Sequence, residues 1–505
     1  MGQDARPLVV VTNREPYEDV ASKTGWAPIQ RAGGVTAALE PVLQALGGDW
    51  IAWGSGAADA LAAPTGIRMV PPADPRYRLH RVFLSAEEVV GYYAGYANQG
   101  LWPLSHLLVE RAHFRRDDWV HYRTVNQRFA DTVAARAPLA ARVFSHDYQL
   151  ALVPAFVRQR RPDLSLVHFW HIPWAPWRIF HLCPQADELV RGLLGADVIG
   201  FQTQADQTAF LEAASHIKGA AVTRDGSIRW AGRTIRADVF PATVDAAAIA
   251  ALVTQARTDA RIQRLRRHLA RADQQLVLSV DRADYTKGIL PRLAAVDRFL
   301  TTHAHRRGRV IFVQVVVPTR LSVPDYRDVF ERVLAESARI NTRFGQGDWR
   351  PIVTVGRSLD RDRLLSLMAA ADIGFVTSLY DGMNLVAKEF VAGRVAEDGV
   401  LLLSQSAGSA DEMTEACLVN PMDPDGMADA LEQALSMPAA ERQRRMHRLR
   451  ANLLTYGPQE WLGAISRTAD RGGRGLRRGE VDEAREALGP RNDGVPTSSP
   501  QAVHS

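Results

Sequence analysis

The chain has 505 residues, of which 46% are hydrophobic and 23% charged, and its formal net charge is +5. The length suggests two large domains, and the composition is typical of a soluble globular protein with no run long enough to span a membrane. Nucleic-acid binding is disfavoured because the basic residues form no stripe interleaved with aromatic residues. Two distant cysteines, Cys183 and Cys417, exclude a disulfide framework and a zinc pattern, so we expect a cytoplasmic protein.

The first half of the chain alternates short apolar strands with helices. Strands are predicted at residues 8–12, 50–54, 143–145, 166–170 and 198–201. Polar residues stand at the ends of several of these strands: Arg14, Asp147, His171 and Gln202. Ligands of open α/β sheets bind at the carboxyl ends of the strands, so we expect these side chains to line one crevice.

Two further features of this half bear on a ligand. Gly33 and Gly34 come directly before a predicted helix, where they allow close approach of the backbone to a ligand. The segment from Tyr92 to Pro103 carries four aromatic residues. It is interpreted either as a core cluster or as a wall that faces a sugar, because aromatic rings stack on pyranose faces.

A second series of strands and helices begins after residue 242. Its strands are predicted at residues 276–280, 310–315, 351–355, 373–376 and 400–403. The fold class is therefore α/β, with two doubly wound domains that face each other across a cleft. We divide the chain into an acceptor-side domain (1–241), a nucleotide-sugar domain (242–455), a helix that packs back on the molecule (456–469) and a disordered tail (470–505).

The segment from Asp381 to Glu389 predicts an anion site in the second domain. A buried strand leads into a tight Asp-Gly-Met-Asn turn, and a helix begins near Leu385. The first N–H groups of that helix have no intrahelical partner, and the helix dipole adds positive charge there. One turn further, Glu389 can accept hydrogen bonds from the hydroxyls of a ribose. A phosphate-linked sugar donor fits this segment.

Cations from both domains extend the predicted site. Arg282 and Lys287 flank a turn into another helix, where they suit a pyrophosphate whose charge grows in the transition state. No aspartate pair here has the spacing of a metal site, so neither a metal nor another cofactor is expected. Arg320 follows a later strand, and together with Arg14 it can clamp a phosphorylated acceptor.

These motifs together resemble the trehalose-6-phosphate synthases of glycosyltransferase family 20, which are retaining enzymes with two Rossmann-like domains (the GT-B fold). The similarity covers roughly residues 7–468 in a consistent order. The Asp381–Glu389 segment and the sequence Asp-Tyr-Thr-Lys-Gly at 284–288 are its most specific parts.

The resemblance implies a role for each matching residue. Glucose transfer would involve His171, Asp381, Arg282 and Lys287. The donor would be bound by Gly33, Gly34, Arg282, Lys287, Leu359, Asn384, Leu385, Val386, Ala387, Lys388 and Glu389. Glucose 6-phosphate would be bound by Arg14, Tyr93, Trp102, Asp147 and Arg320. No side chain is needed as a nucleophile, because in the family's front-side mechanism the departing phosphate takes the acceptor proton.

The expected reaction is transfer of glucose from a nucleotide-glucose donor to glucose 6-phosphate, with UDP-glucose as the first choice of donor, although the residues do not select the base. The alternatives are a glucosylglycerol-phosphate synthase that uses glycerol 3-phosphate, a pseudo-glycosyltransferase on cyclitol phosphates and a sugar-phosphate sensor without turnover. Association into a homo-oligomer is left open, and no membrane or nucleic-acid partner is expected.

The chain departs from the family pattern at three places. Gln149 stands where the family commonly has histidine, Trp174 and Ala175 follow the His-Ile-Pro triplet, and Tyr380 stands where arginine is frequent. The first two changes lie on the first-domain side of the cleft and bear on the acceptor more than on the donor. Tyr380 removes a cation beside the transferred sugar.

Overall fold

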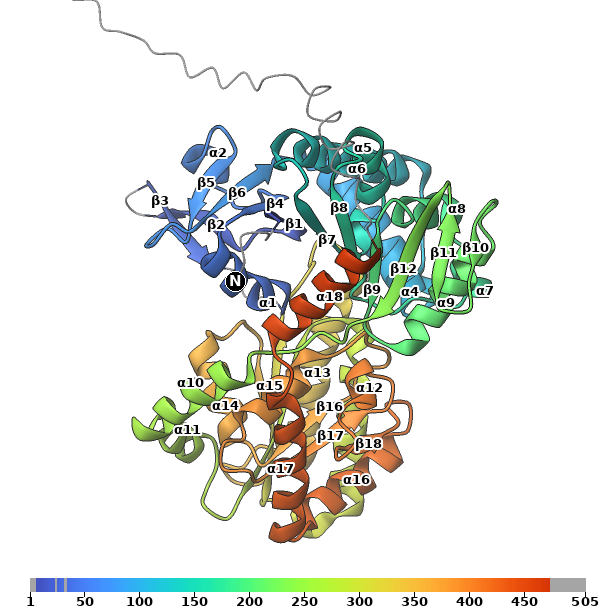
Figure 1. Ribbon diagram of the computed structural model, residues 1–505. Helices are drawn as coiled ribbons and strands as arrows, with labels where there is room; N and C mark the ends of the chain where they lie inside the picture. Colours follow the sequence, from blue (N-terminus) through green and yellow to red (C-terminus); the bar gives the residue numbers. More distant parts are fainter. Residues whose placement is uncertain (1–5, 23–24, 31–33, 473–505) are drawn as a thin grey trace, which may run out of the picture.

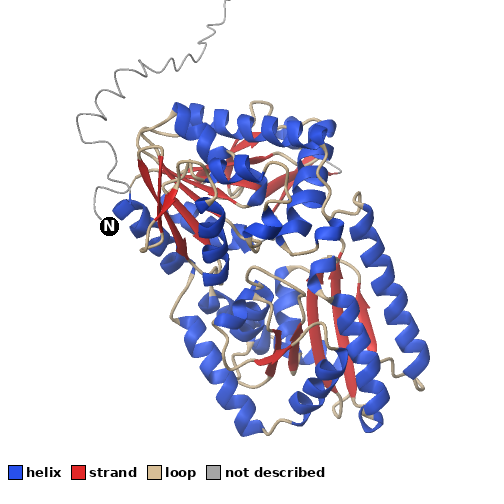
Figure 2. Ribbon diagram, turned by 90° about the vertical axis from the view of Figure 1, so that its right-hand side faces the viewer, coloured by secondary structure: helices blue, strands red, loops and turns tan. Residues whose placement is uncertain are grey.

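The computed structural model describes residues 6–22, 25–30 and 34–472. Two lobes lie one above the other, each built on a twisted sheet with helices on both faces (Figures 1 and 2). The first lobe contains a ten-stranded sheet and the second a six-stranded sheet. This architecture confirms the predicted α/β class with two doubly wound sheets.

The first sheet is parallel in its centre and antiparallel at its edges. Its strand order is β10-β11-β12-β9-β8-β7-β1-β4-β6-β5. β5 runs antiparallel to β6, and β11 runs antiparallel to both β10 and β12. Its strands are β1 (Leu8–Arg14), β4 (Asp49–Trp53), β5 (Ile67–Val70), β6 (Tyr77–Val82), β7 (Arg142–His146), β8 (Ser165–Phe169), β9 (Val198–Phe201), β10 (Ala221–Val222), β11 (Ser227–Trp230) and β12 (Arg233–Val239).

Side chains that alternate along β1 build the cores on the two faces of this sheet. Val9 and Val11 lie in one cluster, with the aromatic residues of the segment that follows β6. Val10 lies in the cluster on the other face, together with Trp461. Because successive side chains of a strand point to opposite faces, continuous apolar runs such as this one indicate a sheet that is covered on both sides.

The second sheet is parallel throughout, in the order β15-β14-β13-β16-β17-β18. Its strands are β13 (Gln275–Arg282), β14 (Val310–Val317), β15 (Ile352–Val355), β16 (Ile373–Val376), β17 (Val400–Ser404) and β18 (Cys417–Val419). One large apolar cluster fills the space between this sheet and its helices.

Helices connect the strands of both lobes. The first lobe contains α1 (Gly34–Leu46), α2 (Asp59–Ala62), α3 (Ala86–Glu88), the π-helical η1 (Val89–Leu101), α4 (Trp102–Ser105), α5 (Arg116–Arg136), α6 (Val153–Arg160), α7 (Trp177–Phe180), α8 (Ala186–Leu193) and α9 (Gln204–Ser215). The second contains α10 (Ala246–Thr258), α11 (Arg261–Leu269), α12 (Ile289–Thr302), α13 (Pro324–Phe344), α14 (Arg361–Ala370), α15 (Leu385–Gly393), α16 (Pro424–Ser436) and α17 (Ala439–Leu454).

The last helix, α18 (Pro458–Gly472), returns to the first lobe, where it contacts α1, β8, β9 and β12 (Figure 1). Trp461 is buried there and donates from Nε1 to the carbonyl of Phe240 at 3.0 Å. Residues 470–472 belong to this helix, while the rest of the tail that was predicted from residue 470 lies outside the described residues.

Several elements were not predicted from the sequence. β2 (Tyr17–Ser22) and β3 (Gly25–Gln30) form a hairpin where a loop was expected, and β5 pairs with β6 beside it. The aromatic segment after residue 88 is helical, with π-type hydrogen bonding. Within the described ranges, no helix combines the length and the apolarity that crossing a bilayer requires.

Candidate active site

The candidate site lies where the two sheets change their winding direction. β1 has β7 on one side and β4 on the other, and β13 lies between β14 and β16. Ligands of open α/β sheets bind outside the strand ends at such points. Four residues that were predicted for the site stand at the ends of these strands: Arg14, Asp147, Arg282 and Asp381.

The turn between β16 and α15 is closed by the side chain of Asn384. This residue has a φ of 75° and accepts from the N–H of Ala387 at 3.2 Å. It also donates to Asp381 Oδ2 at 3.1 Å. The first N–H groups of a helix have no intrahelical acceptor, so Leu385 and Val386 supply the donors that remain at this helix start.

Asp381 and Lys287 form an ion pair in this turn. Lys287 Nζ lies 2.5 Å from Asp381 Oδ2, and each side chain is about one-eighth exposed. Burial alone would raise the pKa of Asp381, but the Lys287 ammonium and the Asn384 amide hold that pKa below its usual range. The Asp381 carboxylate is therefore ionised, and it holds the Lys287 ammonium next to the turn between β16 and α15.

Glycine is required at two positions around this pair. A Cβ on Gly382 would lie 2.3 Å from the carbonyl oxygen of His171, which belongs to the first lobe. Gly288 has a φ of +63°, and a Cβ there would lie 2.0 Å from the carbonyl oxygen of Thr377. Both contacts would be with backbone atoms, so no side-chain movement could relieve them. The glycines allow the two lobes and the two strand ends to meet.

Arg320 reaches from the second lobe into the aromatic residues of the first. Its Nη1 donates to Tyr326 at 2.6 Å, its Nη2 donates to Tyr148 at 3.2 Å, and its guanidinium lies 4.5 Å from the ring centroid of Trp102. The side chain is 4% exposed. Burial opposes the charge, but the surrounding hydroxyls and Asp284 keep the pKa of Arg320 well above its usual value. Arg320 is therefore a fixed cation.

Arg14 and Arg320 meet on one phenol. Arg14 Nη2 donates to Tyr93 Oη at 2.8 Å, and Arg320 Nε lies 3.5 Å from the same oxygen. Burial would raise the pKa of Tyr93, but the two guanidinium groups lower it to about 7. Two arginines that converge on one oxygen form a site suited to a phosphate group. Arg14 of the first lobe and Arg320 of the second thus lie on either side of the Tyr93 hydroxyl, and their role as a clamp stays a prediction.

Arg282 and Trp102 face each other beside this clamp. The Arg282 guanidinium lies 5.6 Å from the ring centroid of Trp102, and the arginine is exposed. Trp102 itself is 4% exposed, and the ring of His106 packs against it with a centroid distance of 4.3 Å. His106 was not predicted for the site. Its Nδ1 pairs with the carbonyl of Trp102 at 2.7 Å, and burial lowers its pKa to about 4, so it is neutral.

Asp147 and His171 lie together at the ends of β7 and β8. Asp147 has a φ of 72°, and its Oδ1 accepts from the N–H of His171 at 3.2 Å. Burial raises the pKa of Asp147 to about 6 and lowers that of His171 to about 3. The ring of His171 contacts His146 through Nε2 at 2.9 Å, which fixes its orientation.

Lys388 has partners other than a donor sugar. Its ammonium donates to the carbonyl of Ala242 at 2.7 Å and pairs with Glu412. Ala242 in turn donates from its N–H to Gln202, whose amide lies 3.5 Å from His171 Nδ1. Lys388 thus ties α15 to the segment that connects the lobes, and its side chain does not point to the helix start.

The other predicted donor residues surround α15. Glu389 is largely buried, which raises its pKa while Arg361 opposes the shift. Leu359 is half-buried against the core of the second lobe. Gly34 begins α1, and Gly33 lies outside the described residues.

The altered loop after His171 is a core feature. Trp174 is 1% exposed and stacks on Phe180 at 4.4 Å, with Phe210 edge-on at 4.9 Å. The backbone N–H of Trp174 donates to Asp206 Oδ1 at 2.8 Å. The tryptophan therefore packs inside the first lobe and does not line the acceptor clamp. Among the described residues, no cluster of histidine, cysteine or carboxylate side chains has a geometry that could hold a metal ion.

Comparisons with known proteins find similarity along most of the chain. The sequence model of Glycosyltransferase family 20 matches residues 6–471. The trehalose-6-phosphate synthase of Mycolicibacterium smegmatis is 36% identical over 482 residues, which cover 93% of this chain and 94% of that protein.

Solved structures agree as well. One is an alpha,alpha-trehalose-phosphate synthase (UDP-forming) from Burkholderia xenovorans in complex with glucose-6-phosphate, with a TM-score of 0.83, 32% identity and coverage of 92% of this chain and 100% of that one. Another, from E. coli and bound with UDP-2-fluoro glucose, has a TM-score of 0.80, 31% identity and coverage of 92% and 99%.

Proposed function

Because the chain belongs to glycosyltransferase family 20, we propose that it transfers glucose from UDP-glucose to glucose 6-phosphate with retention, forming α,α-trehalose 6-phosphate and UDP. The observation that carries the proposal is the convergence of Arg14 and Arg320, one from each lobe, on the hydroxyl of Tyr93. A phosphate that replaces this phenol contact would receive charge-assisted hydrogen bonds from both arginines.

The second lobe holds the donor. The N–H groups of Leu385 and Val386, together with Arg282 and Lys287, bind the pyrophosphate, and Glu389 accepts from the ribose. The first lobe adds Gly33 and Gly34 to the donor site. The second lobe adds Leu359, Asn384, Ala387 and Lys388, of which Asn384 and Lys388 act by holding the helix start and its link to the first lobe.

The first lobe holds the acceptor. Arg14, Tyr93, Trp102 and Arg320 surround its phosphate, and Asp147 accepts from a sugar hydroxyl. In this division of labour, residues 1–241 form the acceptor side, residues 242–455 form the donor side, and the helix after residue 455 fastens the second part to the first.

The chemistry needs no protein nucleophile. The bond between the anomeric carbon of the donor glucose and the β-phosphate oxygen breaks, and the anomeric hydroxyl oxygen of glucose 6-phosphate attacks the same face. The departing phosphate oxygen takes the hydroxyl proton, which leaves UDP. Lys287 and Arg282 stabilise the charge that develops on the pyrophosphate, and His171 and Asp381 orient the transferred glucose.

Product analysis tests the proposal. Purified protein is supplied with UDP-, GDP- or ADP-glucose and with either glucose 6-phosphate or glycerol 3-phosphate, and the phosphorylated product is identified by mass spectrometry and by the NMR coupling of its anomeric protons. Formation of α,α-trehalose 6-phosphate with UDP-glucose is expected. Turnover with glycerol 3-phosphate but not with glucose 6-phosphate would overturn it.

A further inference from the structure

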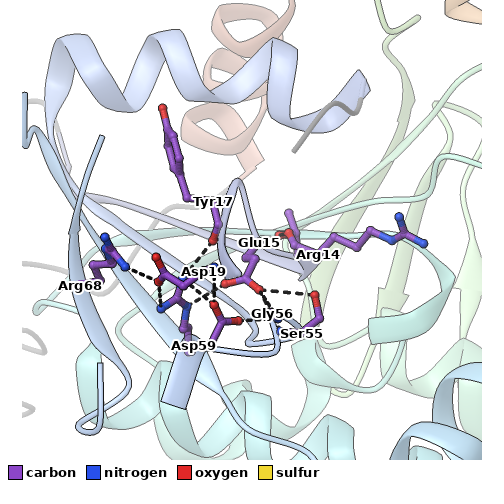
Figure 3. Close-up of polar contacts among 10 residues, drawn as sticks. Arg14, Glu15, Tyr17, Asp19, Ser55, Gly56, Asp59 and Arg68 are labelled. Atoms are coloured by element: carbon purple, nitrogen blue, oxygen red, sulfur yellow. Dashed lines mark hydrogen bonds and ion pairs between the residues drawn. The ribbon is translucent and has the colours of Figure 1, made fainter. Parts of the chain in front are cut away.

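A buried polar network lies directly behind the acceptor clamp. It joins Glu15, Asp19, Asp59 and Arg81, whose side chains are at most 1% exposed, and it extends to Arg68 (Figure 3). The residues come from five neighbouring parts of the first lobe: the turn after β1, β2, α2, β5 and β6. None of them is needed for the reaction described above, and burying so much charge is costly unless every group is paired.

Arg81 is the centre of the network. Its Nε donates to Glu15 Oε2 at 2.7 Å, its Nη1 donates to Asp19 Oδ2 at 2.9 Å, and its Nη2 lies 3.0 Å from Asp59 Oδ1. The other oxygen of Glu15 accepts from the N–H groups of Ser55 at 2.8 Å and Gly56 at 3.3 Å. Glu15 is thus held on both oxygens, by β6 and by the loop after β4.

The backbone on the other side of Arg14 is equally fixed. Thr12 Oγ1 accepts from Trp50 Nε1 at 2.7 Å and donates to the carbonyl of Arg14 at 2.6 Å. Asn13 accepts from Tyr92, the neighbour of Tyr93, at 2.8 Å. The pairing of β1 with β4 shifts register between Thr12 and Arg14, as a β-bulge does, and such a bulge re-aims the side chains that follow it.

The side chains of Arg14 and Glu15 point in opposite directions from this bulge. Arg14 is exposed and extends away from the network, whereas Glu15 is buried within it (Figure 3). Binding a ligand costs conformational entropy, both in the long arginine side chain and in the backbone turn that carries it. A turn that is already fixed removes the backbone part of this cost.

We propose that Glu15 is a positioning residue for the acceptor: held by Arg81 and by the Ser55–Gly56 backbone, it fixes the turn that aims Arg14 at the sugar phosphate. This inference rests on the proposed function, in which Arg14 binds the phosphate of the acceptor. The role differs from general stabilisation of the first lobe, because it acts on one substrate and through one residue.

Steady-state kinetics of Glu15→Ala and Glu15→Gln test the proposal, with KM measured separately for glucose 6-phosphate and UDP-glucose. Glu15→Ala is expected to raise the acceptor KM by about tenfold and to leave the donor KM within about twofold, because a misplaced contact group weakens only the substrate that it touches. Glu15→Gln keeps one oxygen that can accept a hydrogen bond, so its acceptor KM is expected to rise by only about threefold over the wild type. Should the alanine variant fail to fold, this rise, with the donor KM again within about twofold, tests the proposal.

Two controls separate positioning from stability. Asp163→Ala breaks another buried ion pair of the first lobe, 2.8 Å long between Arg161 and Asp163, and should lower Tm with both KM values unchanged. In an Arg14→Ala background, Glu15→Ala should cause no further rise in the acceptor KM, since it acts through Arg14.

Equal shifts of both KM values, an unchanged acceptor KM in a folded Glu15 variant, or a full additional effect in the Arg14→Ala background would overturn the role of Glu15. Absence of disaccharide phosphate with the wild-type protein would instead overturn the proposed function.

Discussion

The two ends of the candidate site are built differently. At the acceptor end, Arg320 of the second lobe is surrounded by tyrosine and tryptophan side chains, and Val323 and Tyr326 share an apolar cluster with the first lobe. The donor end contains the exposed Arg282 and the start of α15, and Lys287 is held there by Asp381. The acceptor end is therefore assembled from side chains of both lobes before any substrate arrives, whereas the donor end is built on a turn of the second lobe that rests against the His171 carbonyl of the first.

Removing the donor-end cation is expected to have the largest effect. Lys287→Ala takes away the charge that faces the leaving pyrophosphate and leaves Asp381 buried without its partner. We expect kcat to fall by about 10²- to 10³-fold, the usual loss for one electrostatic group in a transition state. Arg298→Ala is the matched control: it removes an exposed ion pair between Arg298 of α12 and Asp425, and it should keep full activity. Near-normal turnover of Lys287→Ala would exclude an electrostatic role for this residue.

The acceptor end is tested by Arg320→Ala. The loss of a buried charge-assisted hydrogen bond of about 1.5–3 kcal/mol predicts an acceptor KM that rises by roughly one to two orders of magnitude, with a much smaller change for UDP-glucose. The exposed Arg327→Ala in the same segment serves as control. Because Arg320 also joins the lobes, Tm should fall as well. A donor KM that rises as much as the acceptor KM would show that the two ends are not separate.

Lys388→Met tests whether the Lys388 side chain serves the connection between the lobes or the binding of the donor. If its ammonium serves the connection to Ala242 and Glu412, the variant should lose about 1–3 kcal/mol of the free energy of unfolding, while the KM for UDP-glucose changes little. Thermal denaturation and donor kinetics measure the two effects, and the exposed Lys218→Met is the control. A large rise in the donor KM at unchanged Tm would instead place the side chain on the donor.

The pH dependence of stability is the smallest expected effect. Burial, followed by the hydrogen bond with Asp59, raises the pKa of Glu15 from its ordinary value of 4.5 to about 8. A raised folded-state pKa contributes stability that is complete below pH 4.5 and is lost as pH rises through about 8. Wild-type Tm should therefore fall relative to Glu15→Gln between pH 5 and pH 9. A difference between the two Tm values that is constant across this range would contradict the shift.

The sequence predicted the parts of the fold that follow from local patterns. The apolar runs at residues 8–12 and 373–376 became β1 and β16, and Arg14 and Asp381, which were predicted for the site, stand at or after the ends of these strands. The hairpin of β2 and β3 was missed because Glu18 and Asp19 interrupt the apolar pattern of β2. Asp19 is tolerated inside because Arg81, more than 60 residues away, pairs with it, and no local pattern reveals such a partner.

The candidate site was predictable residue by residue only where a motif carried the signal. Arg14 and Arg320 were expected to form a clamp, yet the phenol on which they meet, the neutral His106 behind Trp102 and the Glu15 network required three-dimensional neighbours. Trp174 had been interpreted as a change near the acceptor, but its ring fills the core between α7 and α9. Which face of a loop a side chain takes depends on packing that the sequence does not state.

Gly382 has a consequence for unwanted hydrolysis of the donor. Its missing side chain lets the turn of the second lobe rest against the carbonyl of His171, where even one methyl group would meet backbone at 2.3 Å. A larger residue would force this turn away from the first lobe. If the transferred glucose lies beside Asp381 and His171 as proposed, we expect water to reach it and release it as the free sugar. The ratio of donor consumed to disaccharide formed therefore depends on Gly382 having no Cβ.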